Sequence, residues 1–122
     1  MSAGAAVVAA LEAGLRADPA LAGIDLGSSR ADVLPRVRVD PPQEIDWSTK
    51  SWRGRELRVA MSVRVAEGQR DRLPALVAAL ERAGERLSGD IGGWRVASAV
   101  LLRATGFGGG ALVEHRVRVV EI

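Results

Sequence analysis

Residues suited to binding another molecule are concentrated in one short segment of this sequence, residues 46–56. Two of the three tryptophans lie in it, the only lysine of the chain stands between them, and two arginines follow. Tryptophan and arginine dominate the binding energy of protein interfaces, and loops often carry functional residues. The segment therefore predicts an arm that binds a partner. Its expected contact residues are Trp47, Lys50, Trp52, Arg53 and Arg55.

The same residues allow two other interpretations. In the first, one indole anchors the loop to its own domain and the arginines are merely solvated. In the second, the basic stretch 47–72, with seven basic groups against three acids, forms a small nucleic-acid-binding module. Its phosphate-binding cations would be Lys50, Arg53, Arg55 and Arg58. The chain has no recognisable base-reading motif, so this second interpretation is the alternative.

The sequence contains no recognisable set of catalytic residues. The chain has no cysteine, and its single histidine, His115, alternates with Val113 and Val117, which predicts a structural, partly buried ring. The glycine-rich run 106–110 lacks Gly-Lys-Ser/Thr and precedes a strand pattern, so it predicts a hairpin connection and not a phosphate-binding loop. We expect no enzymatic activity, no cofactor and no metal site.

Length and composition indicate one domain, residues 1–122. A net charge of +2 and 48% hydrophobic residues are ordinary for a globular chain. The longest apolar stretch, residues 5–11, is too short to span a membrane and has no basic region before it. We therefore expect neither a membrane partner nor a secretory signal.

Hydrophobic periodicity predicts two helices and four strands. In chain order they are helix 5–16, strand 35–40, strand 57–65, helix 71–87, strand 94–103 and strand 112–120. Residues 41–56 form a protruding arm or loop. The strand links have hairpin length, which favours an α+β fold: a mostly antiparallel four-stranded sheet with two helices packed on one face.

The other face of this sheet is expected to carry a row of arginines. They are Arg58, Arg64, Arg116 and Arg118, which alternate with the apolar residues of their strands. Such a face is either solvated, covered by a neighbouring subunit, or exposed to the lumen of an assembly.

One segment also carries a family resemblance. The sequence Trp47-Ser48-Thr49-Lys50, followed by Gly54 and Glu56 and then by an alternating strand and an amphipathic helix, resembles the tail-terminator (tail-completion) family of long-tailed phages and gene transfer agents. Residues 10–21 and 113–119 resemble the opening helix and closing strand of that family. The chain departs from the family at residues 35–40, where the first strand lacks the usual aromatic and final glycine, and at residues 108–110, where glycines replace an acidic turn.

The resemblance implies a structural protein of a virion or phage-like particle tail, assembled in the bacterial cytoplasm. Members of this family form a homo-hexameric ring on the head-proximal end of the tail tube. The ring ends polymerisation of the tube protein and presents a joining surface to the head–tail connector or stopper protein. DNA passes through its lumen without sequence readout.

Overall fold

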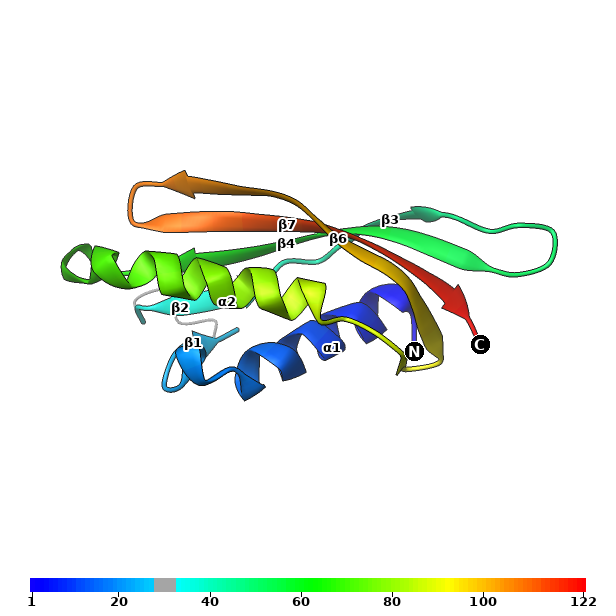
Figure 1. Cartoon of the computed structure of the whole chain (residues 1–122), viewed down its shortest axis with the longest axis horizontal. Coiled ribbons are helices and arrows are strands. Elements are labelled where there is room, and N and C mark those ends of the chain that lie inside the picture. The colour runs from blue at the N-terminus through cyan, green and yellow to red at the C-terminus, as the bar shows by residue number, and fades with distance from the viewer. Residues whose placement is uncertain (28–32) are drawn as a thin grey trace.

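The computed structural model describes residues 1–27 and 33–122, and in these residues a single seven-stranded sheet is covered on one face by two α-helices (Figure 1). The helices are α1 (Ala3–Ala17) and α2 (Leu73–Glu85), and short 3₁₀ turns η1 (Pro19–Leu21) and η2 (Glu67–Arg72) accompany them. The strands are β1 (Asp25–Leu26), β2 (Arg36–Val39), β3 (Gln43–Asp46), β4 (Gly54–Arg64), β5 (Asp90–Ile91), β6 (Trp94–Phe107) and β7 (Gly110–Glu121).

The sheet follows the order β1-β2-β4-β7-β6-β5, and β3 pairs with the part of β4 that β2 leaves free. All pairings are antiparallel except that of β1 with β2. The α+β class and the two helices on one face are thus confirmed, whereas the antiparallel four-stranded sheet is wrong in detail. The additional strands β1 and β5 have two residues each, which is too short for an alternating pattern to show, and β3 has only one apolar residue, Ile45, among its four.

The core lies between the helices and the inward face of the sheet. Strand β4 contributes Leu57, Val59, Met61 and Val63, all at most 1% exposed, because its alternation points every second residue toward the helices. Leu11 and Leu80 meet them from the two helices. Each of these side chains contributes about 1.5–3 kcal/mol to folding, so the core holds the helical layer firmly to one face.

The ends of both helices follow local sequence signals. The Ser2 side chain caps α1 by accepting a hydrogen bond from the N–H of Ala5 at 3.1 Å. The expected helix 71–87 is shorter as an α-helix, because the residues before Leu73 form the 3₁₀ turn η2. Pro74 lies in the first turn of α2, where a backbone N–H has no partner within the helix and its loss costs little.

Two hairpins extend from opposite ends of the molecule. At one end, the connection between β3 and β4, residues 47–53, projects beyond α1 (Figure 1). At the other end, β6 and β7 are joined by Gly108 and Gly109, and Gly109 has a φ of 72°, which favours glycine. The first of these hairpins is the expected arm.

Candidate partner-binding surface

The arm is a hydrogen-bonded hairpin rather than an irregular loop. The N–H of Trp47 donates to the carbonyl of Gly54 at 2.9 Å, and the N–H of Thr49 donates to the carbonyl of Trp52 at 2.9 Å. The Ser48 hydroxyl donates to Asp46 at 2.6 Å and accepts from the N–H of Gly54 at 3.0 Å. Ser48 and Thr49 therefore have structural roles in shaping the arm.

The two indoles of the arm pack against each other across Gly54. The ring centroids of Trp47 and Trp52 lie 5.1 Å apart, with an angle of 53° between the rings. A Cβ atom at Gly54 would lie 2.5 Å from the carbonyl oxygen of Trp47 and 2.6 Å from the ring of Trp52, so only glycine allows this packing. Trp52 is 38% exposed, which leaves much of its ring free for another molecule.

Trp47 links the arm to the uncovered face of the sheet. The guanidinium carbon of Arg118 lies 5.0 Å from the centroid of the Trp47 ring, and the Nε of Arg118 donates to Glu56 at 2.8 Å. A guanidinium over an indole face is attracted by the ring quadrupole. Trp47 is half-buried but does not belong to the core cluster. The arm is therefore held by its own sheet, as the anchoring interpretation expects.

The cations of the arm differ in their surroundings. Arg53 and Arg55 pair within the chain, with Glu121 at 3.6 Å and Glu44 at 3.0 Å. Lys50 is exposed at the tip of the arm and makes no ion pair within the described residues.

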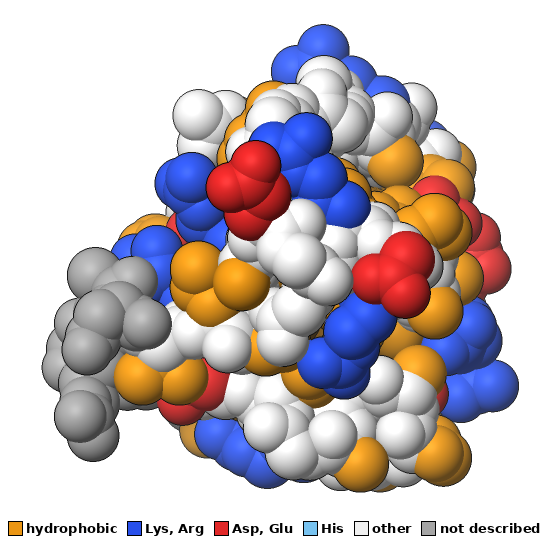
Figure 2. All heavy atoms as spheres, turned by 90° about the vertical axis from the view of Figure 1, so that its left-hand side faces the viewer, with side chains coloured by type: hydrophobic (Ala, Val, Ile, Leu, Met, Phe, Trp, Pro, Cys, Tyr) orange, Lys and Arg blue, Asp and Glu red, His pale blue; other side chains and the backbone are white. Residues whose placement is uncertain are grey.

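This geometry gives no support to the nucleic-acid-binding alternative. Arg55 lies on the helix-covered side of β4 with Leu57, whereas Arg58 lies on the opposite side, so the proposed phosphate contacts do not share one face. The rest of the basic stretch continues into η2, at the opposite end of the molecule from the arm. A view onto that end shows basic side chains in separate places, interspersed with acidic and apolar ones (Figure 2).

On the uncovered face, two arginines lie directly opposite each other. Arg58 of β4 is the cross-strand partner of Arg116 of β7, and neither has an ion pair with an acid in the described part of the chain. The Nε of Arg116 is buried without a hydrogen-bond partner. Like charges in this position destabilise a sheet, so the face has a site that an acidic partner would stabilise.

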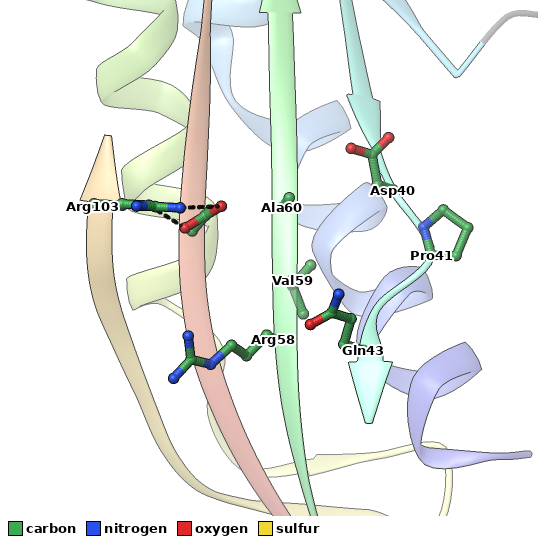
Figure 3. A pocket seen from close by; sticks show the side chains of 8 residues that line it. Asp40, Pro41, Gln43, Arg58, Val59, Ala60 and Arg103 are labelled. Atoms are coloured by element: carbon green, nitrogen blue, oxygen red, sulfur yellow. Dashed lines mark hydrogen bonds and ion pairs between the residues drawn. The ribbon is translucent and has the colours of Figure 1, made fainter. Parts of the chain in front are cut away.

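A hollow of about 420 Å³ adjoins Arg58 (Figure 3). Arg58 projects from β4 across β7, Gln43 and Asp40 form the opposite wall, and Arg103 forms an ion pair with Glu114. The hydrogen bond from Arg103 holds the pKa of Glu114 below its usual value of 4.5.

The other two arginines expected on the uncovered face, Arg64 and Arg118, also lie there, and each contacts another side chain of the same chain. Arg64 lies over the ring of Phe107 at 5.8 Å, and Arg118 contacts Glu56 and Trp47. Three further arginines were not expected here: Arg36 and Arg38 of β2, which lie opposite Arg64 and Ser62, and Arg103. The alternation of strand 35–40 could have placed Arg36 on this face, whereas a β-bulge between Leu101 and Arg103 hides the alternation of β6.

The other expectations concern chemistry. His115 is 0% exposed and packs against α2, which confirms the structural ring, and the run 106–110 does form a hairpin connection. Within residues 1–27 and 33–122, no group of three or more His, Asp or Glu side chains could hold a metal ion. Neither helix of this part of the chain has the length and apolar character of a membrane-spanning helix.

Comparison with known proteins identifies a solved structure with a similar fold. No protein-family model and no curated protein sequence matches the chain. Among solved structures, a chain in the structure titled "Virion of native gene transfer agent (GTA) particle" is similar to it, with a TM-score of 0.75 and 23% sequence identity. The match covers 98% of this chain and 99% of the other. The chain therefore has the fold of a protein found in a gene transfer agent virion, over the whole length of both.

Proposed function

We propose that this chain is a structural protein of a virion or phage-like particle tail, which closes the head-proximal end of the tail tube as a ring. The ring ends tube polymerisation and provides the surface for head–tail joining. The observation that carries this proposal is the shared fold with a gene transfer agent virion chain along the full length of both chains. The Trp47-Ser48-Thr49-Lys50 segment, with its tail-terminator resemblance, narrows the proposal to the tail end.

The proposed mechanism is capping. A tube grows because each added subunit leaves a surface for the next, so a ring that binds this surface without reproducing it stops growth. Such a ring needs heterologous contacts, in which one surface binds a different surface on its neighbour. The arm and the arginine face supply two distinct surfaces of this kind.

The proposed partners follow from this position. Copies of the same chain form a homo-hexamer, one side of the ring meets the tube protein, and the other meets the connector or stopper protein. DNA passes through the lumen without sequence readout. The proposed contact residues are Trp47, Lys50, Trp52, Arg53 and Arg55 in the arm, and Arg58, Arg64, Arg116 and Arg118 on the sheet.

Deleting the gene in a particle-producing strain tests the proposal. We expect tails of abnormal, uncontrolled length and unjoined heads, and restoration of uniform particles when the gene is supplied in trans. A complementing gene carrying Arg16→Ala, at an exposed cation of α1, serves as a control that should restore fully. Normal tail length and normal joining in the deletion strain would contradict the proposed function.

A further inference from the structure

The outer edge of β6 is a long strand edge with no partner in the described residues. β5 and the carbonyl of Gly89 cover β6 only from Trp94 to Val96, and beyond these residues β6 is hydrogen-bonded to β7 alone. Backbone N–H and C=O groups along residues 97–107 therefore face outward. An edge of this kind is a template for pairing with another chain.

This edge has little of the protection that natural edge strands carry. Residues 97–107 include one charged residue, Arg103, and no proline, although two β-bulges interrupt the strand. Val100 is 41% exposed and Leu102 is 37% exposed. A long, nearly uncharged, apolar edge in an isolated subunit is a risk of aggregation, so it is expected to be covered in the working assembly.

A second free edge lies on the other side of the same sheet. Strand β3 pairs with β4 only, and β4 is separated from β6 by β7. Ile45, at the middle of β3, is 59% exposed. The connection at the end of the arm, residues 47–53, projects beyond α1 (Figure 1), whereas the Glu44 carboxylate lies beside Gly4 of α1. Another subunit can therefore approach the β3 edge from the uncovered face of the sheet.

We propose that β3 of one copy adds to the outer edge of β6 in a second copy, so that the sheets of neighbouring subunits become continuous. The two edges carry opposite charges, because β3 has Glu44 and Asp46 and no base, whereas the free part of β6 has Arg103 and no acid. Glu44 and Arg103 keep their ion pairs with Arg55 and Glu114 of their own subunits and lie on opposite faces of the sheet. Ile45 and Val100 both lie on the uncovered face, opposite Glu56 and Arg116 of their own sheets. The added strand thus places apolar side chains against each other on that face.

A groove beside this edge can receive the alternate side chains of the added strand. It has a volume of about 360 Å³, is lined by Leu73, Val77 and Ala104, and includes Arg70. The side chains of β3 that point toward the helical side are Glu44 and Asp46, so Arg70 offers a cation to a carboxylate there. Main-chain hydrogen bonds with alternate side chains in pockets are the usual form of β-strand addition.

The contact is heterologous, because it joins two different edges on opposite sides of one sheet. Such contacts close into a ring when the rotation allows it. The inference rests on the proposed ring function and specifies how one subunit holds the next.

Disulfide cross-linking tests the pairing cleanly, because the chain has no cysteine of its own. Three double variants combine Ile45→Cys with Ser98→Cys, Val100→Cys or Thr105→Cys, all on the uncovered face of β6. Oxidation of concentrated protein should give a ladder of disulfide-linked multimers for at least one of them, because paired cross-strand positions meet the geometry of a disulfide. The matched control, Ile45→Cys with Ala13→Cys on the exposed side of α1, should remain monomeric on a non-reducing gel.

Mixing single variants tests the direction of the contact. Ile45→Cys protein and the best β6 variant should each stay monomeric alone, and their mixture should give a 1:1 dimer and nothing larger. Dimers formed equally well by one variant alone, or cross-linking no faster than in the control pair, would overturn the pairing. If the cross-link forms but deletion of the gene leaves tail length and joining normal, the proposed function fails and the pairing stands. If deletion disrupts tails but no cross-link forms, only the pairing fails.

Discussion

The ring of His115 occupies the space that a side chain at Gly84 would need. A Cβ atom at Gly84 would overlap three atoms of the imidazole, so α2 packs against β7 at this point only because residue 84 is glycine. Both residues are buried, and Gly84 lies near the end of α2. The approach of helix and sheet thus depends on one pair of residues.

Gly84→Ala is expected to destabilise the fold, although alanine is the better helix former. The helix propensity gain is about 1 kcal/mol. Overpacking a buried site usually costs about 1–3 kcal/mol, and here the obstacle is a ring enclosed by the core, so the cost should exceed the gain. The free energy of unfolding from urea titration measures the difference.

Gly14→Ala is the matched control, because Gly14 lies in α1, is exposed, and has no atom within 4 Å of the place that a Cβ atom would take. It should stabilise the protein by up to about 1 kcal/mol. Adding His115→Ala to Gly84→Ala should cost less than the two single changes together. Additive effects would show that the two residues do not restrict each other.

His115 should make stability depend on pH below neutrality. Burial lowers the pKa of His115 from its usual 6.5. The Glu81 backbone and the Glu85 and Glu81 carboxylates raise this pKa but do not offset the effect of burial. Neither ring nitrogen has a hydrogen-bond partner of ordinary geometry. Below pH 6.5 the unfolded chain therefore binds a proton that the folded chain does not, and stability falls as the pH decreases. Unfolding free energies at pH 7.5 and 5.5, chosen as about one unit on either side of this value, should show the loss. The variant His115→Leu should show a smaller loss or none.

Asp18 should contribute stability that is lost only in stronger acid. Burial alone would raise its pKa, but hydrogen bonds from the N–H of Ala20 and from Arg82 hold the pKa below 3.8. Its contribution is therefore present above pH 3.8 and lost as the pH falls below this value. Because Asp18 also caps η1, we expect Asp18→Ala to cost about 1–2 kcal/mol at neutral pH.

Asp18→Asn separates the two roles of this residue, because asparagine keeps an oxygen for the N–H of Ala20 and loses the charge that pairs with Arg82. It should cost less than the alanine variant. Glu12→Gln, which removes an exposed ion pair with Arg16, should change stability by less than about 0.5 kcal/mol. Equal losses for all three variants would contradict this account.

Trp47→Ala should impair assembly more than folding. Its ring contacts Trp52, Gly54 and Arg118 and lies outside the core cluster, so the subunit should keep a cooperative thermal transition. The arm should lose its link to the sheet, and with it the ability to cap tubes of the purified tail tube protein, measured as tube length by electron microscopy. Arg16→Ala should cap normally. If Trp47→Ala does not fold, Trp47 is part of the core. If the variant folds and caps tubes normally, the arm is not part of the contact surface.

Much of the architecture is readable from the sequence because it rests on local periodicity. Alternation of apolar residues over β4 and β7 predicts two long strands with one buried face, and the 3.6-residue spacing of leucines predicts α2. The arm is also predictable in position, since tryptophans among charges fit no core pattern. These features depend on neighbours within a few residues of each other along the chain.

The partners of each side chain were decided only by the tertiary structure. Arg53 pairs with Glu121 and Arg118 with Glu56, residues far apart in the sequence, and the Arg58–Arg116 opposition arises from the register of β4 against β7. The free edges of β3 and β6 follow from strand order, which alternation does not encode, because a strand has the same pattern whether it lies at the edge or in the middle of a sheet. The sequence by itself determined which residues are buried and which segment protrudes, whereas folding decided which charges remain unpaired and which edges remain open.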